Sequence, residues 1–359
     1  MEYAEEALRV MNDISEAYIV PLGKMQVSTA SYYISGAGAV GLVLCVVVSA
    51  LLSSRLNPRG KHVVITGGSS GIGLAVAVKY AKMGANVTLV ARNMKKLEDA
   101  KIRVEKAIGA SKNKCHIISL DTSSSQEAVT KALVTTPNPN GDVDILVNCA
   151  GTSIAGTFQD TDPGEFSRMF NTNVMGSVYP TRALLPQLKK NKNGSTRIIF
   201  VSSQVAQCAL HGYTAYASSK WALRGIAEAL QMEVKPYNII VSVAYPPDTD
   251  TPGYELEMES KPDLTKSLSE TGSVFSSEEV AADIVKYSGL GYFGISTGLD
   301  GFFLKQAHPG MSPVNNLWET VQMILLSPLA KIISIFVVLT WDIQCRDAVR
   351  KEQAKAKAE

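Results

Sequence analysis

The chain has 359 residues, 19% of them charged, and a formal net charge of only +2. A nucleic-acid-binding protein usually concentrates basic residues on one face, so this balance predicts no nucleic-acid partner. The five cysteines show no C-x-x-C spacing and the four histidines form no i, i+4 pair. These patterns argue against a disulfide framework and a metal site, and they favour a reducing compartment.

The N-terminal part of the chain is predicted to be a membrane anchor. Residues 1–31 are polar and mildly acidic, whereas the stretch from Tyr32 to Leu52 carries no charge. About 20 apolar residues cross the hydrocarbon core of a bilayer, so residues 32–54 are predicted to form a transmembrane helix; the alternative, a buried core helix, is usually shorter. Because basic residues stay on the cytoplasmic side, residues 1–31 should be lumenal and the rest should begin in the cytosol. The basic residues after the helix are Arg55, Arg59 and Lys61.

Residues 60–310 are predicted to form one α/β domain. Segments rich in β-branched residues alternate with longer, charged, amphipathic segments such as residues 94–109. This alternation is typical of βαβ units with right-handed connections, so we expect a Rossmann-type, doubly wound parallel sheet. The strand-like segments are residues 62–68, 86–92, 115–121, 144–151, 197–203 and 238–246.

A glycine-rich turn with the spacing Gly-x-x-x-Gly-x-Gly follows the first of these segments and opens a helix. Glycines let the backbone approach a pyrophosphate, and a helix N-terminus offers free N–H groups and the positive end of its dipole. Such a turn alone can be purely structural, but its place in a βαβ unit favours a dinucleotide site. The candidate cofactor-binding residues of the turn are Gly67, Ser69, Ser70, Gly71, Ile72 and Gly73.

The residues after the second and third strands favour NADPH as the cofactor. NAD sites place an acid near the end of the second strand, where this chain has Arg92. A guanidinium there can bind the 2′-phosphate that distinguishes NADP(H) from NAD(H). Lys96 either reaches the same phosphate or lies on a solvated helix face. Asp121, at the end of the third strand, is placed to hold the adenine amino group.

Tyr216 and Lys220 are candidate catalytic residues, because the i, i+4 spacing puts both side chains on one helix face. A tyrosine titrates near pH 10, and a neighbouring ammonium favours the phenolate and lowers that pKa. Ser203 lies 13 residues before Tyr216 at the end of a strand, where its hydroxyl can hold a substrate carbonyl oxygen. Ser202 takes that role if the strand ends one residue earlier.

The glycine turn, the segment Asn148–Gly151, Asn173 and the Ser203/Tyr216/Lys220 group together resemble the classical short-chain dehydrogenase/reductase family. The resemblance implies a sheet of about seven strands over roughly residues 60–290, which makes residues 60–310 the catalytic domain.

The resemblance also implies a role for each site residue. Tyr216 is the acid/base, and Lys220 binds the nicotinamide ribose and lowers the tyrosine pKa. Ser203 positions the carbonyl and Asn173 holds the water of a proton relay. Asn148 shapes the strand behind the cofactor.

The segment Tyr213–Gly253 is similar to a narrower group within that family, the reductases of long-chain 3-keto sphingoid bases. It differs from the usual family pattern by a second proline after the sixth strand. The resemblance implies NADPH-dependent reduction of 3-ketosphinganine to sphinganine in sphingolipid biosynthesis, on the cytosolic face of the endoplasmic reticulum membrane. The lipid bilayer is then a partner, and whether the chain forms a homo-oligomer is left undecided by the sequence. The alternatives are a membrane-bound steroid or retinoid ketone reductase and a catalytically silent, NADP-sensing scaffold.

A second apolar segment, residues 316–341, is interrupted by Glu319, Pro328 and Lys331. It is too short for two spans of about 20 residues each, and a charge near the middle is unfavourable in a single straight span. We therefore expect a membrane-associated hairpin bent at Pro328, near the mouth of the active site. Residues 342–359 are expected to be a basic cytosolic tail, whose last lysines are either a retrieval signal or an ordinary solvated end.

Overall fold

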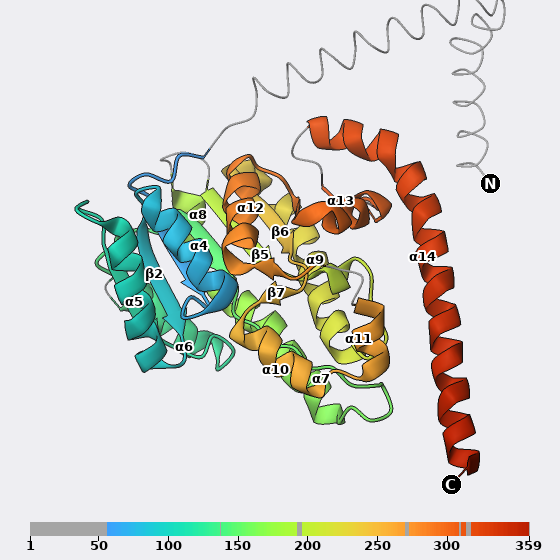
Figure 1. Cartoon of the computed structure of the whole chain (residues 1–359). Helices are drawn as coiled ribbons and strands as arrows, with labels where there is room; N and C mark the ends of the chain where they lie inside the picture. Colours follow the sequence, from blue (N-terminus) through green and yellow to red (C-terminus); the bar gives the residue numbers. More distant parts are fainter. Residues whose placement is uncertain are drawn as a thin grey trace, which may run out of the picture. The chain divides into compact units, whose positions relative to one another are not determined.

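The computed structural model describes residues 56–136, 138–191, 196–269, 273–308, 310–313 and 317–358. Contacts divide the chain into two units, Met1–Ser53 and Ser54–Glu359. The expected lumenal tail at residues 1–31 and the expected transmembrane helix at residues 32–54 lie outside the described residues. The described part of the second unit is an α/β domain followed by one long helix (Figure 1).

The elements have the following bounds. The strands are β1 (His62–Thr66), β2 (Asn86–Ala91), β3 (Cys115–Ser119), β4 (Ile145–Asn148), β5 (Thr196–Val201), β6 (Ile239–Tyr245), β7 (Thr249–Asp250), β8 (Phe275–Ser276) and β9 (Gly294–Ser296). The helices are α4 (Gly71–Lys82), α5 (Met94–Ile108), α6 (Gln126–Thr130), α7 (Pro163–Met169), α8 (Gly176–Lys190), α9 (Thr214–Val234), α10 (Pro252–Ser260), α11 (Asp263–Ser269), α12 (Ser277–Gly289), α13 (Gly298–Ala307) and α14 (Leu317–Ala358). A π-helical turn, η3 (Phe170–Met175), joins α7 to α8.

Seven strands form one parallel sheet in the order β3-β2-β1-β4-β5-β6-β9. The chain moves outward from β1 through β2 and β3, and then returns to add β4 on the other side of β1. This is the doubly wound arrangement that the sequence predicts, and all six predicted strands are confirmed. Sheets of this kind bind ligands where the strand order reverses, at the carboxyl ends of the strands, which here means β1 and β4.

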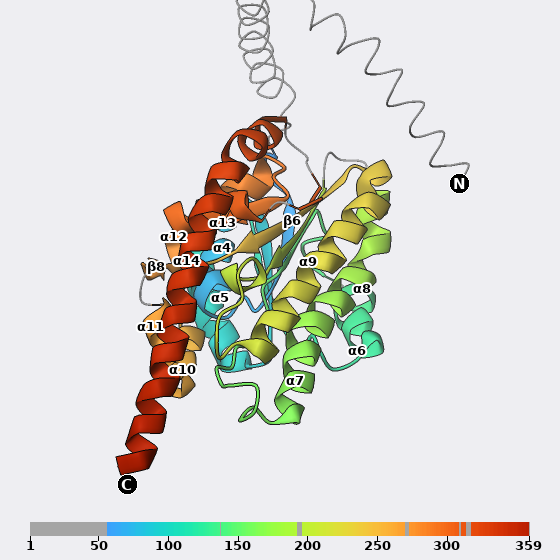
Figure 2. The ribbon, with the colours of Figure 1, turned by 90° about the vertical axis from the view of Figure 1, so that its right-hand side faces the viewer.

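Helices cover both faces of the sheet. Figure 2 shows α4, α5 and α12 on one face and α8 and α9 on the other. In β1, Val63 and Ile65 pack into the buried cluster on the α4 face, while Val64 packs into the cluster on the α9 face. A strand with apolar residues at consecutive positions needs a layer on each side. The two clusters hold the carboxyl edge of the sheet, and the loops that leave it, on a rigid support.

The sequence does not locate the seventh strand, β9. It has three residues, and only Ile295 among them is buried. So short a segment carries too little strand preference to stand out. It forms because β6 offers an unpaired edge, with Val243 to Tyr245 opposite Gly294 to Ser296. Close by, β7 and β8 pair as a separate two-stranded sheet.

The expected hairpin over residues 316–341 is wrong. The described part of the segment, residues 317–341, lies in one continuous helix, α14, which passes through Pro328 and includes the expected basic tail up to Ala358. A proline removes one helical hydrogen bond and bends the helix, whereas a hairpin turn leaves about four backbone groups unpaired at each new helix end. The helix accordingly bends within its N-terminal third (Figure 1), where Pro328 lies.

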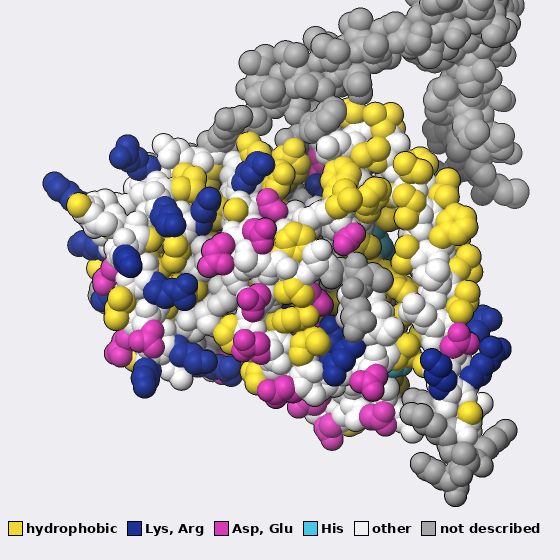
Figure 3. Space-filling model, viewed as in Figure 1, with side chains coloured by type: hydrophobic (Ala, Val, Ile, Leu, Met, Phe, Trp, Pro, Cys, Tyr) yellow, Lys and Arg dark blue, Asp and Glu magenta, His cyan; other side chains and the backbone are white. Residues whose placement is uncertain are grey.

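Helix α14 contacts α13 and α11 of the domain and exposes apolar side chains along much of its length. Glu319 is buried and its carboxylate lies 2.6 Å from Lys305 of α13. Figure 3 shows hydrophobic side chains along the upper and middle part of the helix and charged side chains toward its C-terminal end. Within the described residues, Glu319–Lys351 is the one stretch whose length and composition suit a membrane crossing, with a mean hydropathy of 2.2 in its most apolar window. Its large exposed side chains include Ile324, Leu325, Leu329, Ile332, Ile335, Phe336, Leu339 and Ile343.

Candidate active site

A cavity of about 1050 Å³ lies at the carboxyl ends of the central strands. Its walls are the turn after β1, the ends of β2 and β3, the loops after β4, β5 and β6, and the first turns of α9. It continues to α13 and α14, so one end meets the glycine turn and the other meets apolar helices. Of the site residues predicted from the sequence, all line this cavity except Asn148 and Asn173.

The glycine turn fits the close approach of a ligand. Gly67 has a φ of +66°, and a methyl group there would lie 2.8 Å from the backbone nitrogen of Ala150. A methyl group on Gly73 would lie 2.3 Å from the carbonyl oxygen of Gly67. Ser70 is the N-cap of α4, but its side chain makes no capping hydrogen bond. The first N–H groups of α4 are thus left for a ligand such as a phosphate.

The rim beyond β2 and β3 carries two cations and one acid. Arg92 and Lys96 are exposed and line the cavity, which favours a ligand-facing place for Lys96 over a purely solvated one. Burial raises the pKa of Asp121, but two hydrogen bonds from Ser123 and the charge of Arg92 outweigh it and lower this pKa below its ordinary value. The glycine turn, the open helix N-terminus and this rim together fit a nicotinamide dinucleotide.

Tyr216 and Lys220 lie on successive turns at the start of α9. The ammonium nitrogen of Lys220 is 5.8 Å from the centre of the Tyr216 ring and donates a hydrogen bond to the carbonyl of Val201 at 3.0 Å. Burial lowers the pKa of Lys220 to about 8. The lysine therefore bridges β5 and the tyrosine, and its charge is held at an energetic cost.

The structure separates the two serines that follow β5. Ser202 is 3% exposed, and its hydroxyl donates to the backbone carbonyl of Lys220 at 2.9 Å, so it ties β5 to α9. Ser203 lines the cavity, and its side chain hydrogen-bonds with Tyr216. This geometry favours Ser203 over Ser202 as the residue that meets a carbonyl oxygen.

The expected lowering of the tyrosine pKa by Lys220 is not found. Burial and the negative charges of Glu257 and Asp248 raise the pKa of Tyr216 well above its ordinary value, and the hydrogen bond with Ser203 opposes them only in part. Tyr216 therefore holds its proton at neutral pH in this pocket, which is the state that a proton donor needs.

Asn173 is fully buried in the π-helical turn η3 and joins three elements. Its Oδ1 accepts from the backbone N–H of Thr152 at 2.8 Å, and its Nδ2 donates to the Thr152 carbonyl at 3.0 Å and to the Ser219 hydroxyl at 2.9 Å. A methyl group on Gly151 would lie 3.0 Å from Oδ1 of Asn173 and 3.4 Å from Nζ of Lys220. Asn173 thus fixes the loop after β4 against α9, beside the lysine.

Asn148, which the resemblance places in the strand behind the cofactor, does not itself line the cavity. It is 1% exposed, and its Nδ2 donates to the hydroxyl of Thr181 on α8 at 2.9 Å. The side chain points to the helix layer because β4 ends here and its last residue faces α8. The bond fixes the strand end from which Ala150 and Gly151 enter the cavity.

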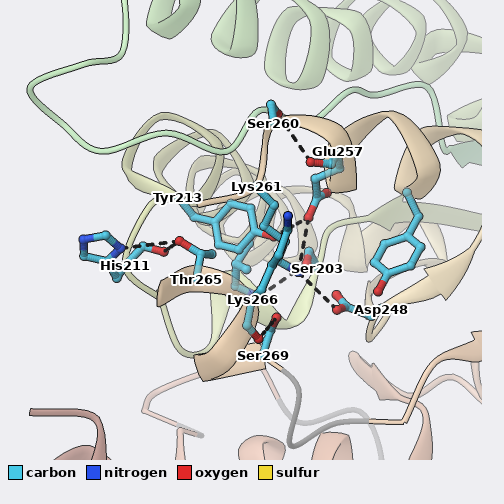
Figure 4. Close-up of polar contacts among 12 residues, drawn as sticks. Ser203, His211, Tyr213, Asp248, Glu257, Ser260, Lys261, Thr265, Lys266 and Ser269 are labelled. Carbon is cyan, nitrogen blue, oxygen red and sulfur yellow. Dashed lines mark hydrogen bonds and ion pairs between the residues drawn. The ribbon is translucent and has the colours of Figure 1, made fainter. Parts of the chain in front are cut away.

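Sequence reasoning missed a charged group whose carboxylates act on the pKa of Tyr216. Figure 4 shows its members Tyr213, Asp248, Glu257 and Lys261. The hydroxyl of Tyr213 donates to the carboxylate of Glu257. The ammonium of Lys261 lies 3.5 Å from Asp248 and 4.0 Å from Glu257. The available signal was Asp248 in the loop with the second proline, whereas Glu257 and Lys261 at i, i+4 look like an ordinary surface pair.

The family model described as short chain dehydrogenase matches residues 61–261. This match spans more than half of the chain and agrees with the sheet order and with the site described above. The chain belongs to the short-chain dehydrogenase/reductase family and is an oxidoreductase with a nicotinamide cofactor.

Relatives within the family are more specific. The chain is 46% identical over 309 residues to 3-ketodihydrosphingosine reductase of Bos taurus, covering 85% of this chain and 92% of the relative. It is 46% identical over 317 residues to 3-dehydrosphinganine reductase of Danio rerio, covering 88% and 95%. Among solved structures it is similar to L-sorbose reductase from Gluconobacter frateurii complexed with NADPH and L-sorbose, with 30% identity, a TM-score of 0.56, and coverage of 64% and 90%.

Proposed function

We propose that this chain reduces a long-chain 3-keto sphingoid base, 3-ketosphinganine, to sphinganine with NADPH. Two relatives that it matches over most of its length carry the name of this reductase. The observation that carries the proposal is the single cavity that runs from the glycine turn, past Ser203 and Tyr216, to the apolar helices α13 and α14. Reduction of a ketone with a long alkyl chain needs a cofactor site, a proton donor and an apolar channel, in this order along the cavity.

The far end of the cavity suits an alkyl chain. On α13 it is lined by Phe303 and Leu304, and on α14 by Ile333, Val337 and Val338. Burying a methylene group stabilises binding by about 0.8 kcal/mol. The chain of a sphingoid base therefore gains more from this end than a short polar ketone would, which favours a lipid substrate over a sugar.

The roles of the chain's own residues follow from their positions. The bound cofactor supplies a hydride to the ketone carbon. Ser203 donates a hydrogen bond to the carbonyl oxygen, and Tyr216 donates its phenolic proton to that oxygen as it becomes a hydroxyl. Lys220 holds the nicotinamide ribose and, from 5.8 Å, its charge stabilises the phenolate left behind. Asn173 does not line the cavity, so it would support a relay water for Tyr216 through the Thr152 loop and Ser219, which it holds in place.

NADPH rather than NADH is the proposed cofactor. Arg92 stands on the rim after β2, and Lys96 lies one helical turn further on at the same rim. Two cations at this place attract the additional phosphate of NADPH, and an arginine can bind it bidentately. NADH offers neither charge nor phosphate oxygens there.

The enzyme is proposed to act on the cytosolic face of the endoplasmic reticulum membrane. Residues of α14 from Ala330 to Gln344 line the catalytic cavity, so this stretch stays with the domain that uses cytosolic NADPH. Its outer side exposes large apolar side chains, which suits a helix lying in the interface of the bilayer. An epitope tag at Glu359 should be digested by protease in sealed microsomes, whereas a tag at Met1 should be protected. A protected C-terminal tag would mean that α14 crosses the membrane.

The test of the function is NADPH oxidation by the purified, detergent-solubilised chain. We expect 3-ketosphinganine to be turned over and sphinganine to form in equal amount. Tyr216→Phe should bind NADPH but lose turnover by about 10²–10⁴-fold, because the ring still packs and only the proton donor is lost. Turnover of steroid or retinoid ketones with none of 3-ketosphinganine would contradict the substrate, and NADPH binding without any turnover would indicate a scaffold.

A further inference from the structure

The charged group that acts on Tyr216 presents more negative than positive charge to the cavity. Asp248 and Glu257 both line the cavity, whereas Lys261 does not, and its side chain is only 1% exposed. One ammonium between two carboxylates leaves one carboxylate charge without a cation. A second cation is therefore favoured on the cavity side of this group, because an unbalanced charge in a partly desolvated site is costly.

Asp248 is the carboxylate with capacity to accept a ligand. Its side chain is 37% exposed, against 10% for Glu257. Its contact with Lys261 is 3.5 Å long, whereas charge-assisted hydrogen bonds between ammonium and carboxylate are usually about 2.7–2.9 Å. Glu257 is held by the hydroxyl of the buried Tyr213, whereas Asp248 hydrogen-bonds with the half-buried Tyr254, so Glu257 is the more fixed member of the pair.

The charges along the cavity are divided between its two halves. The lysine and arginine side chains on its wall are Arg92, Lys96 and Lys220, and all three belong to the cofactor half. Within the described residues, the charged side chains that line the substrate half are all acids. A cofactor phosphate and a cationic substrate would each meet the opposite charge in its own half.

We propose that Asp248, supported by Glu257, binds a cationic amino group on the carbon next to the ketone. The inference rests on the proposed function and deepens it, because a 3-keto sphingoid base carries its amine on C2, beside the C3 carbonyl. The nitrogen and the oxygen of such a pair lie within one hydrogen-bond length of each other. A carboxylate that reaches the nitrogen must therefore lie beside the group that holds the oxygen. Asp248 and Glu257 line the same cavity as Tyr216 and their charges act on its hydroxyl, as this requires.

The subsite also suits the chemistry of the reaction. An amine beside a carbonyl titrates near the range of a peptide α-amino group, about 7.7–8.0, so the carboxylates favour its ammonium form. The ammonium withdraws electrons from the ketone carbon and favours attack by hydride. Burial raises the pKa of Tyr216 most, and the charges of Glu257 and Asp248, which the ammonium would offset, raise it further. Binding the amine would thus bring the phenol closer to proton transfer.

The first test needs no variant. The kcat/KM of the parent enzyme is measured with 3-ketosphinganine and with 1-hydroxyoctadecan-3-one, which has the same chain and ketone but no amine. We expect a preference of at least tenfold for the amino ketone, the minimum for loss of one charge-assisted hydrogen bond. Equal efficiencies would overturn the subsite.

The second test asks whether Asp248 carries the preference. In Asp248→Asn the ratio of the two kcat/KM values should fall by roughly tenfold to a hundredfold, and Glu257→Gln should lower it in the same direction. Glu259→Gln is the matched control, because it removes an exposed acid from the same helix as Glu257 but away from the cavity. Thermal unfolding verifies that each variant is folded. An equal loss with both ketones in Asp248→Asn would overturn the proposal.

The two proposals fail in different ways. If the parent enzyme oxidises NADPH with neither ketone, the proposed function is wrong and the subsite falls with it. If it reduces both ketones equally well, the reductase function stands and only the ammonium subsite is lost.

Discussion

Replacing Asn173 with alanine should both destabilise the protein and slow catalysis. Asn173 is 0% exposed and makes three hydrogen bonds of 2.8–3.0 Å, two to the Thr152 backbone and one to Ser219. Each contributes about 1 kcal/mol net, and a buried partner left unpaired costs about 1–3 kcal/mol. We therefore expect Asn173→Ala to lower the free energy of unfolding by roughly 3–5 kcal/mol.

The catalytic effect should appear in kcat more than in KM. Thr152 follows Gly151, and a methyl group on Gly151 would already touch Nζ of Lys220, so the loop and the lysine share one narrow space. Freeing the loop should misplace the lysine and any relay water without changing the alkyl-chain end of the cavity. A misplaced catalytic group can cost about 10²-fold in rate.

Denaturant unfolding and steady-state kinetics with the long-chain ketone measure the two effects. Asn171→Ala is the control, because Asn171 is exposed on the same π-helical turn, and it should change stability by no more than about 0.5 kcal/mol. Asn173→Asp keeps the acceptor for the Thr152 N–H but places a carboxylate oxygen about where Nδ2 donates to the Thr152 carbonyl, so it should not restore stability. A loss below about 1 kcal/mol in Asn173→Ala would refute the reasoning from its hydrogen bonds.

Three further predictions concern the cofactor loop and the lysine. Arg92→Asp should lower kcat/KM with NADPH by about tenfold or more, and kcat/KM with NADH far less, because it removes a cation from the rim that would bind the 2′-phosphate. An unchanged ratio of kcat/KM with NADPH to kcat/KM with NADH would contradict this. Gly73→Ala, whose methyl group would lie 2.3 Å from the Gly67 carbonyl, should weaken NADPH binding at least tenfold and cost about 1–3 kcal/mol of stability, as titration and thermal unfolding would show. Its control is Gly225→Ala, an open position on α9 where alanine should stabilise the helix by up to about 1 kcal/mol. At pH 7, Lys220→Met should raise the free energy of unfolding of the cofactor-free protein above that of the parent. This difference should shrink as pH rises from about 8 to 10.5, and a difference independent of pH would contradict the lowered pKa of Lys220.

The sign of the last effect follows from proton binding. The pKa of Lys220 is about 8 in the folded protein and 10.5 ordinarily. Between these values the unfolded chain holds a proton that the folded protein lacks, so the stability of the parent protein rises with pH in this window. Methionine does not titrate, so the difference between the two proteins must narrow there. Methionine also loses the hydrogen bond to Val201, which changes the size of the gain but not its slope.

The six long strands and the glycine turn could be predicted because their signals are local. Val63, Val64 and Ile65 of β1 are buried consecutively, and such apolar runs between turn residues are visible in the sequence itself. The i, i+4 spacing of Tyr216 and Lys220 is equally local. Those features depend on neighbours in sequence, and the structure places them as expected.

The features that escaped prediction depend on distant partners. β9 forms against an edge of β6, about 50 positions earlier in the chain, and has no pattern of its own. Glu319 looked like an interruption of a membrane segment, whereas it pairs with Lys305 of α13 and fixes the start of α14. The pKa of Tyr216 follows the same rule, because Glu257 lies 41 positions away in the sequence but contributes its charge to the tyrosine.

The protonation of the site suits a reductase. Hydride addition to a ketone requires a proton donor, and burial with the neighbouring carboxylates keeps Tyr216 in the phenol form. Oxidation of an alcohol would require the phenolate instead, which the same surroundings disfavour. The carboxylates make the phenol a reluctant donor until a cation offsets them, and the ammonium of the proposed substrate supplies that cation beside the carbonyl. A ketone without the amine would leave Tyr216 facing both carboxylate charges. Asp248 and Glu257, which help to keep the proton on Tyr216, would then also favour the amino ketone, whose ammonium allows that proton to be transferred.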